Sequence, residues 1–259
     1  MRIEAVKTRI LVPPQDDLLA AIRDALRAVP EKSVLAVTSK VVSIGEGRCV
    51  PKSEVADKDE LIKQEADKYL SRDFAPGGWV MHTIKNNLFI PSAGIDESNA
   101  YGHYILWPRD VKKTCHALRA WVQKEYGVRE VGVVITDSHT IPLRRGTMGI
   151  SLAHAGFVAI KDYRGTGDLF GRKYVITTLD IADGLAAAAV LAMGEGSEQT
   201  PLALITEIPF VEFGSGEESG KPFSSHEIEE KEDLYYPLLS SVPWEKGGGG
   251  SERRGMIDM

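Results

Sequence analysis

The sequence predicts an α+β protein with mixed sheets and flanking helices. Short runs rich in β-branched residues end at Gly, Pro, Asn, Ser or Asp, as strands do. Other stretches carry apolar residues at helical spacing behind an aspartate that can cap a helix. The two kinds of segment mix irregularly and do not form βαβ repeats, which favours this class over a doubly wound parallel sheet.

The composition is typical of a soluble globular protein. The 259 residues are 43% hydrophobic and 26% charged, with a formal net charge of −6, so no overall basic field exists to attract nucleic acid or anionic lipid. The apolar stretch Ala186–Met193 is too short to span a bilayer. Cys49 and Cys115 match no metal or redox spacing. We therefore expect a cytoplasmic protein that binds neither nucleic acid nor membranes.

The predicted strands are short runs bounded by turn-forming residues. They are Val34–Val37 together with Val41–Val42, Val80–Ile84, Leu88–Ile90, Val131–Ile135, Tyr174–Thr178 and Leu202–Ile205.

The predicted helices share a capping aspartate and an apolar face. They are a segment from Asp16 or Asp17 to about Leu26, one behind Asp110 with Val111, Leu118 and Val122 inward, one behind Asp180 over Ile181–Met193, and a weaker one over Asp59–Leu70 before a break at Pro76–Gly78. In the helix behind Asp180, Gly184 and four consecutive alanines predict that another element packs very close.

The last forty-odd residues change character. We assign residues 1–213 to a catalytic region, which could comprise two subdomains, and 214–246 to a polar and acidic extension. The composition of Gly247–Ser251 is that of a linker, so 247–259 are expected to form a flexible tail. Within the extension, Tyr235 to Leu239 either dock as a short helix or stay solvated.

Several common catalytic and nucleotide-binding motifs are absent from the sequence. It contains no P-loop, and Gly165 to Gly171 is one residue too long for a dinucleotide fingerprint and precedes a predicted strand. It also lacks the nucleophile elbow of serine hydrolases and the histidine pair of zinc peptidases. Any nucleotide must therefore be held in another way.

Three acidic segments lie where predicted elements end. Asp96 follows the strand Leu88–Ile90, Asp137 and Ser138 end the next long strand, and Glu195 ends the alanine-rich helix. Together these side chains would supply the hard oxygen ligands that Mg²⁺ or Mn²⁺ prefers. Taken singly, each acid is more simply explained as a turn or capping residue.

Arginines and a histidine follow the second acidic segment. Arg144 and Arg145 suit phosphate or carboxylate groups, because a guanidinium binds either through two parallel hydrogen bonds. His139 could act as an acid, a base or a ligand. The alternatives are solvated surface arginines and a histidine that is merely hydrogen-bonded.

These segments, read in order, resemble a known family. Ala-Gly-Ile-Asp-x-Ser-Asn at 93–99, Thr-Asp-Ser at 136–138, Arg-Arg-Gly at 144–146, Asp-Tyr-x-Gly at 162–165 and Met-Gly-Glu-Gly at 193–196 resemble the coenzyme F420-0:γ-glutamyl ligase family. The resemblance covers about Arg2 to Ile205. It implies an intertwined homodimer of mixed α+β subunits that uses GTP and divalent metal to join L-glutamate, through its amine, to a carboxylate of a cofactor precursor.

The resemblance also implies roles for individual residues. Asp96 and Asp137 would bind one cation, Mg²⁺ or Mn²⁺, with Ser138 and Glu195 on a second. The nucleotide, GTP or ATP, would contact Arg9, Ile10, Leu11, Val12, Ser39, Lys40, Asn99, Gly194, Gly196, Ser197, Glu198, Gln199 and Thr200. Arg144, Arg145 and His139 would serve catalysis, the arginines by neutralising charge on an acyl phosphate as it forms.

Two departures from the family pattern bear on the substrates. Ile44 stands where many members carry a lysine, which leaves the GTP preference open. Thr140-Ile141 replaces the usual Gly-Arg pair after the metal aspartate, which removes a cation and favours a folate-type acceptor over the phosphodiester-bearing F420-0. F420-0 ligation is the alternative, and a metal-dependent phosphatase or a non-catalytic cofactor-binding module are alternatives of another class.

Overall fold

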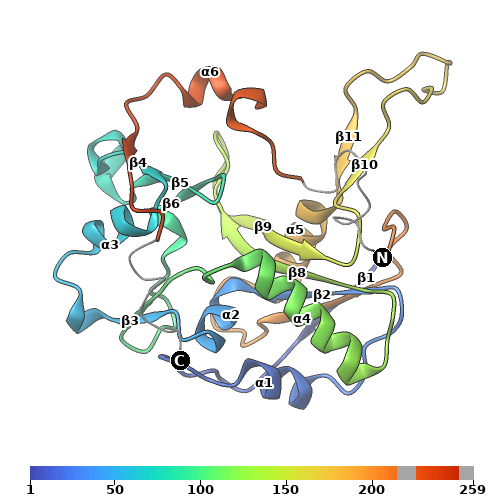
Figure 1. The fold of residues 1–259 in the computed structure, drawn as a ribbon, viewed down its shortest axis with the longest axis horizontal. Coiled ribbons are helices and arrows are strands. Elements are labelled where there is room, and N and C mark those ends of the chain that lie inside the picture. The colour runs from blue at the N-terminus through green and yellow to red at the C-terminus, as the bar shows by residue number, and fades with distance from the viewer. Residues whose placement is uncertain (215–225, 251–259) are drawn as a thin grey trace.

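The computed structural model of the protein describes residues 1–214 and 226–250, and these residues form a mixed α+β fold, as predicted (Figure 1). Its central sheet has the order β1-β12-β2-β8-β9, in which β2 and β8 are parallel and the other neighbours antiparallel. The strands are β1 (Arg2–Val6), β2 (Ser33–Thr38), β8 (Val131–His139), β9 (Met148–Ala155) and β12 (Leu202–Thr206).

Successive side chains along the strands point to opposite faces of the sheet, and each face packs against its own hydrophobic core. On β2, Leu35 and Val37 face one core, whereas Val34 and Ala36 face the other. Both faces of β2 are covered, which accounts for its uninterrupted apolar run from Val34 to Val37 between Ser33 and Thr38. The first core is covered by α1 (Leu18–Ala25), α2 (Ser39–Gly45) and α4 (Val111–Tyr126), and the second by α5 (Ile181–Met193).

The predicted helix caps are confirmed, and α5 packs closely at Ala186, whereas Gly184 is exposed with no atom within 4 Å of its Cβ position. Asp17, Asp110 and Asp180 each accept a backbone N–H bond at the start of α1, α4 and α5. A Cβ atom on Gly149 of β9 would lie 2.4 Å from the carbonyl oxygen of Ala186. The small residues of α5 therefore allow β9 to approach its backbone.

A second lobe stands beside the sheet and has its own small core. It contains an antiparallel sheet in the order β13-β4-β5-β6, the helix α3 and the pair β3 and β7. Their bounds are β3 (Cys49–Pro51), α3 (Lys58–Glu65), β4 (Lys68–Tyr69), β5 (His82–Lys85), β6 (Leu88–Pro91), β7 (His103–Ile105) and β13 (Glu245–Lys246), with 3-10 turns at Lys52–Glu54, Arg72–Phe74, Pro76–Gly78 and Ser92–Gly94.

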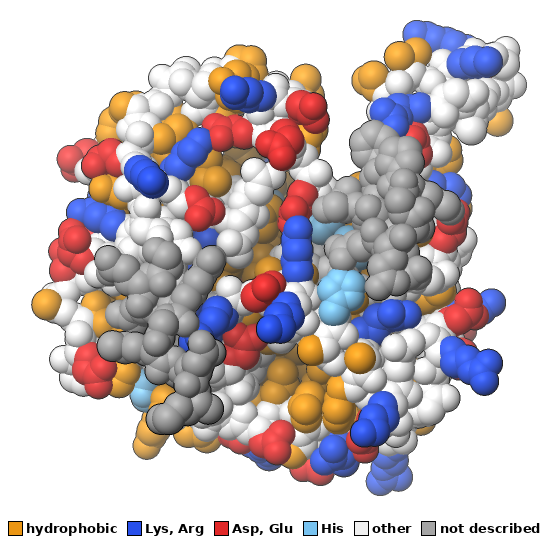
Figure 2. Space-filling model, in the orientation of Figure 1, with side chains coloured by type: hydrophobic (Ala, Val, Ile, Leu, Met, Phe, Trp, Pro, Cys, Tyr) orange, Lys and Arg blue, Asp and Glu red, His pale blue; other side chains and the backbone are white. Residues whose placement is uncertain are grey.

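A two-stranded arm projects from the body of the molecule. It consists of β10 (Ile160–Asp162) and β11 (Thr178–Asp180), joined by a long loop that carries exposed Leu169 and Phe170. In the space-filling view the arm stands clear of the rest, with hydrophobic and basic side chains at its end (Figure 2).

Several predicted elements differ from the observed ones. Val41–Val42 lies in α2, where both side chains enter the core, because a short apolar run fits a buried helix as well as a strand. Most of Tyr174–Thr178 lies in the loop of the arm, with Val175 and Ile176 exposed. The weak helix over Asp59–Leu70 ends at Glu65, since the chain turns there into β4.

The remaining differences concern strands and their limits. β1 and β9 were not predicted. The alternation of charged and apolar residues in β1 is a strand signal that the prediction overlooked, whereas small residues blur the pattern of β9. The strand predicted at Val80–Ile84 is observed at His82–Lys85. The predictions at Leu88–Ile90, Val131–Ile135 and Leu202–Ile205 are confirmed, although β8 continues to His139.

The C-terminal segment 226–250, which we call the strap, connects the two lobes. Its Glu227 pairs with Lys112 of α4 at 2.7 Å, and its Glu230 pairs with Lys68 of β4 at 2.6 Å. It contains a 3-10 turn at Glu230–Glu232 and the short helix α6 (Tyr236–Leu239), whose Leu238 stays exposed. Of the predicted flexible tail, 247–250 donate backbone hydrogen bonds to Asp67 and the end of α3, and 251–259 lie outside the described residues. No helix among the described residues is long and apolar enough to cross a membrane.

Candidate functional site

A cavity of about 300 Å³ opens where the two lobes meet. Since β2 and β8 are parallel neighbours, the turn that leads from β2 into α2 lies beside the end of β8 that carries Asp137. The loop after α5 and the segment after β1 complete the walls. The lining residues are Thr8–Leu11, Thr38–Val41, Ser43, Ile44, Gly94, Asp96, Asn99, Ile105–Trp107, Asp137, Ser138, Val190 and 193–201.

Two carboxylates and one ammonium group meet in this cavity. Lys40 Nζ lies 2.6 Å from Asp96 Oδ2, and it also donates to the carbonyl oxygen of Ser98 at 3.1 Å. The other Asp96 oxygen accepts from the backbone N–H of Ser98 at 2.7 Å. Asp137 Oδ1 accepts from the N–H of Ser138 at 2.8 Å, and Oδ2 accepts from the indole N–H of Trp107.

The two carboxylates titrate differently because their surroundings differ. Burial raises the pKa of Asp137 to about 6, against hydrogen bonds from Ser138 and Trp107 that favour the ionised form. Burial also opposes ionisation of Asp96, but the charge and hydrogen bond of Lys40 outweigh it and hold the pKa of Asp96 below its usual value. The negative charge of Asp96 in turn raises the pKa of Asp137. An added cation would relieve this unfavourable charge.

The donor set fits a divalent cation with open coordination positions. Asp96 and Asp137 present carboxylate oxygens to one cavity, and Lys40 already places a positive charge against Asp96. Ser138 and Glu195 line the same cavity. In the part of the chain that the structure describes, no three His, Cys, Asp or Glu side chains form a closed metal cluster. A bound cation would therefore complete its shell with water or substrate oxygens, as Mg²⁺ commonly does.

Hydrogen bonds to distant segments of the chain fix the position of the loop after α5. Thr8 N–H donates to the carbonyl oxygen of Gln199 at 3.2 Å, and the Gln199 side chain donates back to Thr8 O at 2.7 Å. Asn99 reaches across the cavity and donates to Gly196 O at 3.0 Å. The Glu198 carboxylate accepts from Gly196 N–H at 2.8 Å. These bonds fix the loop in the wall of the cavity, which residues 193–201 line.

The segment after β1 contributes Arg9 at the edge of the cavity. Its guanidinium forms two hydrogen bonds with Asp16, at 2.8 and 2.7 Å. Asp16 also accepts the N–H of Val12 at 2.9 Å, so one carboxylate fixes both the arginine and the loop around it.

The structure brings most of the predicted site residues together. All four predicted metal ligands line the cavity, and so does every predicted nucleotide-contacting residue except Val12, which is exposed beside it. The three predicted catalytic residues do not line it. His139 is half-buried toward Asp183, whose charge partly offsets the burial that lowers the pKa of His139. Arg144 and Arg145 are exposed, because β8 continues past Asp137 and carries their loop away.

Sequence reasoning missed Trp107 as a site residue. Trp107 is 2% exposed, lies two residues beyond β7 and donates to Asp137. A buried tryptophan outside any motif looks like ordinary core in a sequence. Ile44, which marks a departure from the family pattern, does line the cavity.

Comparisons with known proteins identify the family of this chain. The family model for F420-0:Gamma-glutamyl ligase matches residues 6–207, which span every residue of the cavity. The chain belongs to this family. Coenzyme F420:L-glutamate ligase of Methanopyrus kandleri is 33% identical over 79% of this chain and 86% of its own length. The enzyme of the same name from Methanococcus maripaludis is 29% identical over 83% and 92%. A third, from Methanocaldococcus jannaschii, is 35% identical over 51% and 53%.

Proposed function

We propose that this chain is a nucleotide- and metal-dependent γ-glutamyl ligase that joins the amine of L-glutamate to a carboxylate of an acceptor. Family membership supports a ligase of this kind. The observation that carries the details is one cavity lined by both an acidic pair, Asp96 and Asp137, and the glycine-containing loop 194–200. Mg²⁺ or Mn²⁺ bound there would neutralise phosphate charge and align the reacting groups.

The chemistry follows from the low reactivity of a carboxylate. An oxygen of the acceptor carboxylate attacks the γ-phosphorus of GTP or ATP, the nucleoside diphosphate leaves, and an acyl phosphate forms. The glutamate amine then attacks the acyl carbon, phosphate leaves, and the nitrogen loses a proton. Lys40 and the 194–200 loop would orient the phosphates, since both line the cavity beside the acidic pair.

The acceptor is best supported as an F420-type molecule. The curated relatives are named coenzyme F420:L-glutamate ligases and match most of this chain. The prediction of a folate-type acceptor depended on Thr140 and Ile141. These residues lie in the loop that leads away from the cavity and do not line it. Folate remains the second candidate, because the Gly-Arg pair of the family is absent at these positions.

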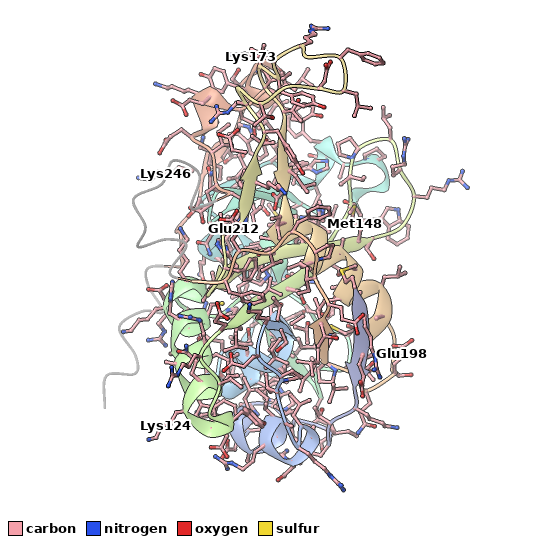
Figure 3. The ribbon with its side chains drawn as sticks, turned by 90° about the vertical axis from the view of Figure 1, so that its right-hand side faces the viewer. Lys124, Met148, Lys173, Glu198, Glu212 and Lys246 are labelled. Carbon is pink, nitrogen blue, oxygen red and sulfur yellow. The ribbon has the colours of Figure 1, made fainter. Side chains whose placement is uncertain are left out.

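A homodimer is supported by the arm. Leu169 and Phe170 are 96% and 95% exposed, and Val175 and Ile176 are also largely exposed. The side view labels Lys173 in the arm and Glu198 in the cavity loop, and the two lie far apart (Figure 3). The arm of one copy therefore does not cover its own cavity, and its apolar side chains are available to a second copy.

One assay separates the candidate functions. Purified protein with Mn²⁺, L-glutamate, either GTP or ATP, and an equal mixture of F420-0 and a reduced folate is analysed by product mass. We expect γ-glutamylated F420-0 and phosphate release that requires an acceptor, and hydroxylamine in place of glutamate should trap a hydroxamate. Exclusive folate product would reverse the acceptor assignment. Acceptor-independent phosphate release would indicate a phosphatase, and binding without turnover a cofactor-binding module.

A further inference from the structure

Trp107 contacts both segments that carry the acidic pair. Its indole N–H donates to Asp137 Oδ2. Gly94, two residues before Asp96, packs on the same edge of the ring: a Cβ atom there would lie 2.1 Å from Trp107 Nε1. Gly94 also has a φ of +68°, so glycine is needed both for the turn and for the approach of the indole. One ring thus borders the segments of both carboxylates.

Trp107 is in turn held by a cluster of buried charges. Arg48 Nε donates to the carbonyl oxygen of Trp107 at 3.1 Å, and Lys85 Nζ lies over its ring at 5.8 Å from the centroid. Both cations bind Glu65 Oε2, at 2.9 and 2.7 Å, and Glu65 is 1% exposed. Buried ion clusters of this kind add little net stability compared with apolar packing. A role in fixing the position of Trp107 would account for its presence beside the cavity.

We propose that Trp107 is a positioning residue that orients the Asp137 carboxylate for cation binding, and that the Arg48–Glu65–Lys85 cluster fixes the indole. This inference rests on the proposed function, because it assigns the orientation to a divalent cation. Among the described residues, Asp137 Oδ1 accepts one hydrogen bond, from the N–H of Ser138, and Oδ2 accepts one, from the indole of Trp107. The remaining lone pairs are left for the cation, and the carboxylate cannot rotate without breaking both bonds. Removal of such an outer donor commonly weakens metal binding 10- to 100-fold.

The first test is Mn²⁺ binding to Trp107→Phe by calorimetry, without nucleotide or acceptor. We expect affinity to fall about 10- to 100-fold. Trp121→Phe is the matched control, because Trp121 of α4 packs on Tyr126 of the same helix and on Arg23 of α1 and does not line the cavity. The Mn²⁺ affinity of this variant should equal that of the wild type. Wild-type affinity in Trp107→Phe, or no Mn²⁺ binding by the wild-type protein, would overturn the inference.

A second measurement does not depend on the folding of Trp107→Phe. Metal-free protein labelled with ¹⁵N-tryptophan gives an indole signal for each of its four tryptophans, and Trp→Phe variants at 79, 121 and 244 assign the Trp107 signal by elimination. Asp137→Asn and Lys85→Met should each shift this signal. Lys63→Met, which removes a cation over Tyr69, should leave it in place. An unmoved Trp107 signal in Asp137→Asn would refute the hydrogen bond.

The two proposals fail separately. If the wild-type protein lacks ligase activity and Trp107→Phe binds Mn²⁺ more weakly than the wild type, the proposed reaction is refuted and the positioning role is supported. If the wild-type protein is an active ligase and Trp107→Phe binds Mn²⁺ with unchanged affinity, the proposed reaction is supported and the positioning role is refuted.

Discussion

Lys40 and Asp96 form an ion pair across the cavity, with Nζ 2.6 Å from Oδ2. Lys40 lies at the start of α2 in the central fold, whereas Asp96 follows the second lobe's sheet, so the contact joins the two lobes. The ammonium group partly neutralises an acidic pair that would otherwise hold two negative charges close together. A divalent cation bound by the same carboxylates would repel this ammonium and release it toward the nucleotide.

Lys40→Met should therefore bind Mn²⁺ more tightly and turn over more slowly. Unit charges 4 Å apart interact by about 4 kcal/mol at an effective dielectric constant of about 20, and water reduces this, so we expect roughly a tenfold gain in affinity. Calorimetry of the metal-free protein measures it, and steady-state kinetics should show a raised KM for the nucleotide. Lys52→Met is the control, because Lys52 pairs with the neighbouring Glu97 and does not line the cavity. Unchanged or weaker Mn²⁺ binding in Lys40→Met would contradict the expected repulsion between the bound cation and the Lys40 ammonium.

Asp96→Asn and Asp137→Asn should each lower turnover by orders of magnitude while the protein stays folded. Asparagine keeps the size of aspartate and removes the anionic ligand. Because Asp137 is buried and its pKa is raised to about 6, loss of its charge should not lower the melting temperature of metal-free protein. Turnover and melting are measured on the same preparations. Near-normal turnover in both variants would remove the acidic pair from the reaction.

The sequence predicted correctly those elements whose capping residues and apolar pattern match the side chains that the fold buries. The caps Asp17, Asp110 and Asp180 and the limits of α5 are confirmed. It failed where tertiary contacts decide the structure. Val41 and Val42 have high strand propensity, yet they are helical because α2 buries them against the sheet.

The candidate site was predicted through motifs that lie at the ends of elements. Asp96, Asp137 and Glu195 come from distant parts of the chain and line one cavity. Trp107 carried no such signal, since its role depends on an indole orientation that only the fold defines. Arg144 and Arg145 were predicted from proximity in sequence, but the extension of β8 to His139 separates them from the cavity.

Asp16→Asn should destabilise the protein near neutral pH and have less effect in acid. Hydrogen bonds from Arg9 and from the N–H of Val12 hold the pKa of Asp16 well below its usual value of 3.8. A lowered pKa stabilises the fold above about pH 4, and this stabilisation is lost as the pH falls and the carboxylate protonates. Urea unfolding of wild type and variant at pH 7 and pH 3 should show the smaller difference at pH 3. A difference that grows in acid would contradict the assignment, and a double-mutant cycle with Arg9→Met isolates the pair.

Leu169→Ser combined with Phe170→Ser should convert a dimer into a monomer. The two side chains are almost fully exposed on the arm, so they add little to the stability of one copy and can contribute to an interface. Sedimentation at micromolar concentration measures the change in mass. Trp79→Ser is the control, because Trp79 is 84% exposed on the second lobe and lies outside the arm. A wild-type protein that is monomeric would contradict the dimer itself.

Gly247→Ala should detach the end of the strap from the second lobe. The N–H groups of 247–250 donate to Asp67, Lys63, Ala66 and Gln64 at 2.8 to 2.9 Å, which satisfies carbonyls at the end of α3. A Cβ atom on Gly247 would lie 2.0 Å from the carbonyl oxygen of Ala66, so alanine cannot enter without moving the backbone. We expect a loss of about 1 to 3 kcal/mol in unfolding free energy and faster proteolysis of the C-terminus. Gly184→Ala is the matched control: it lies inside α5 with nothing within 4 Å of its Cβ position. That substitution should stabilise the protein by about 0.5 to 1 kcal/mol, because alanine loses less backbone entropy in a helix. Equal stability of Gly247→Ala and the wild type would show that residues 247–250 act as a linker, as their composition alone suggested.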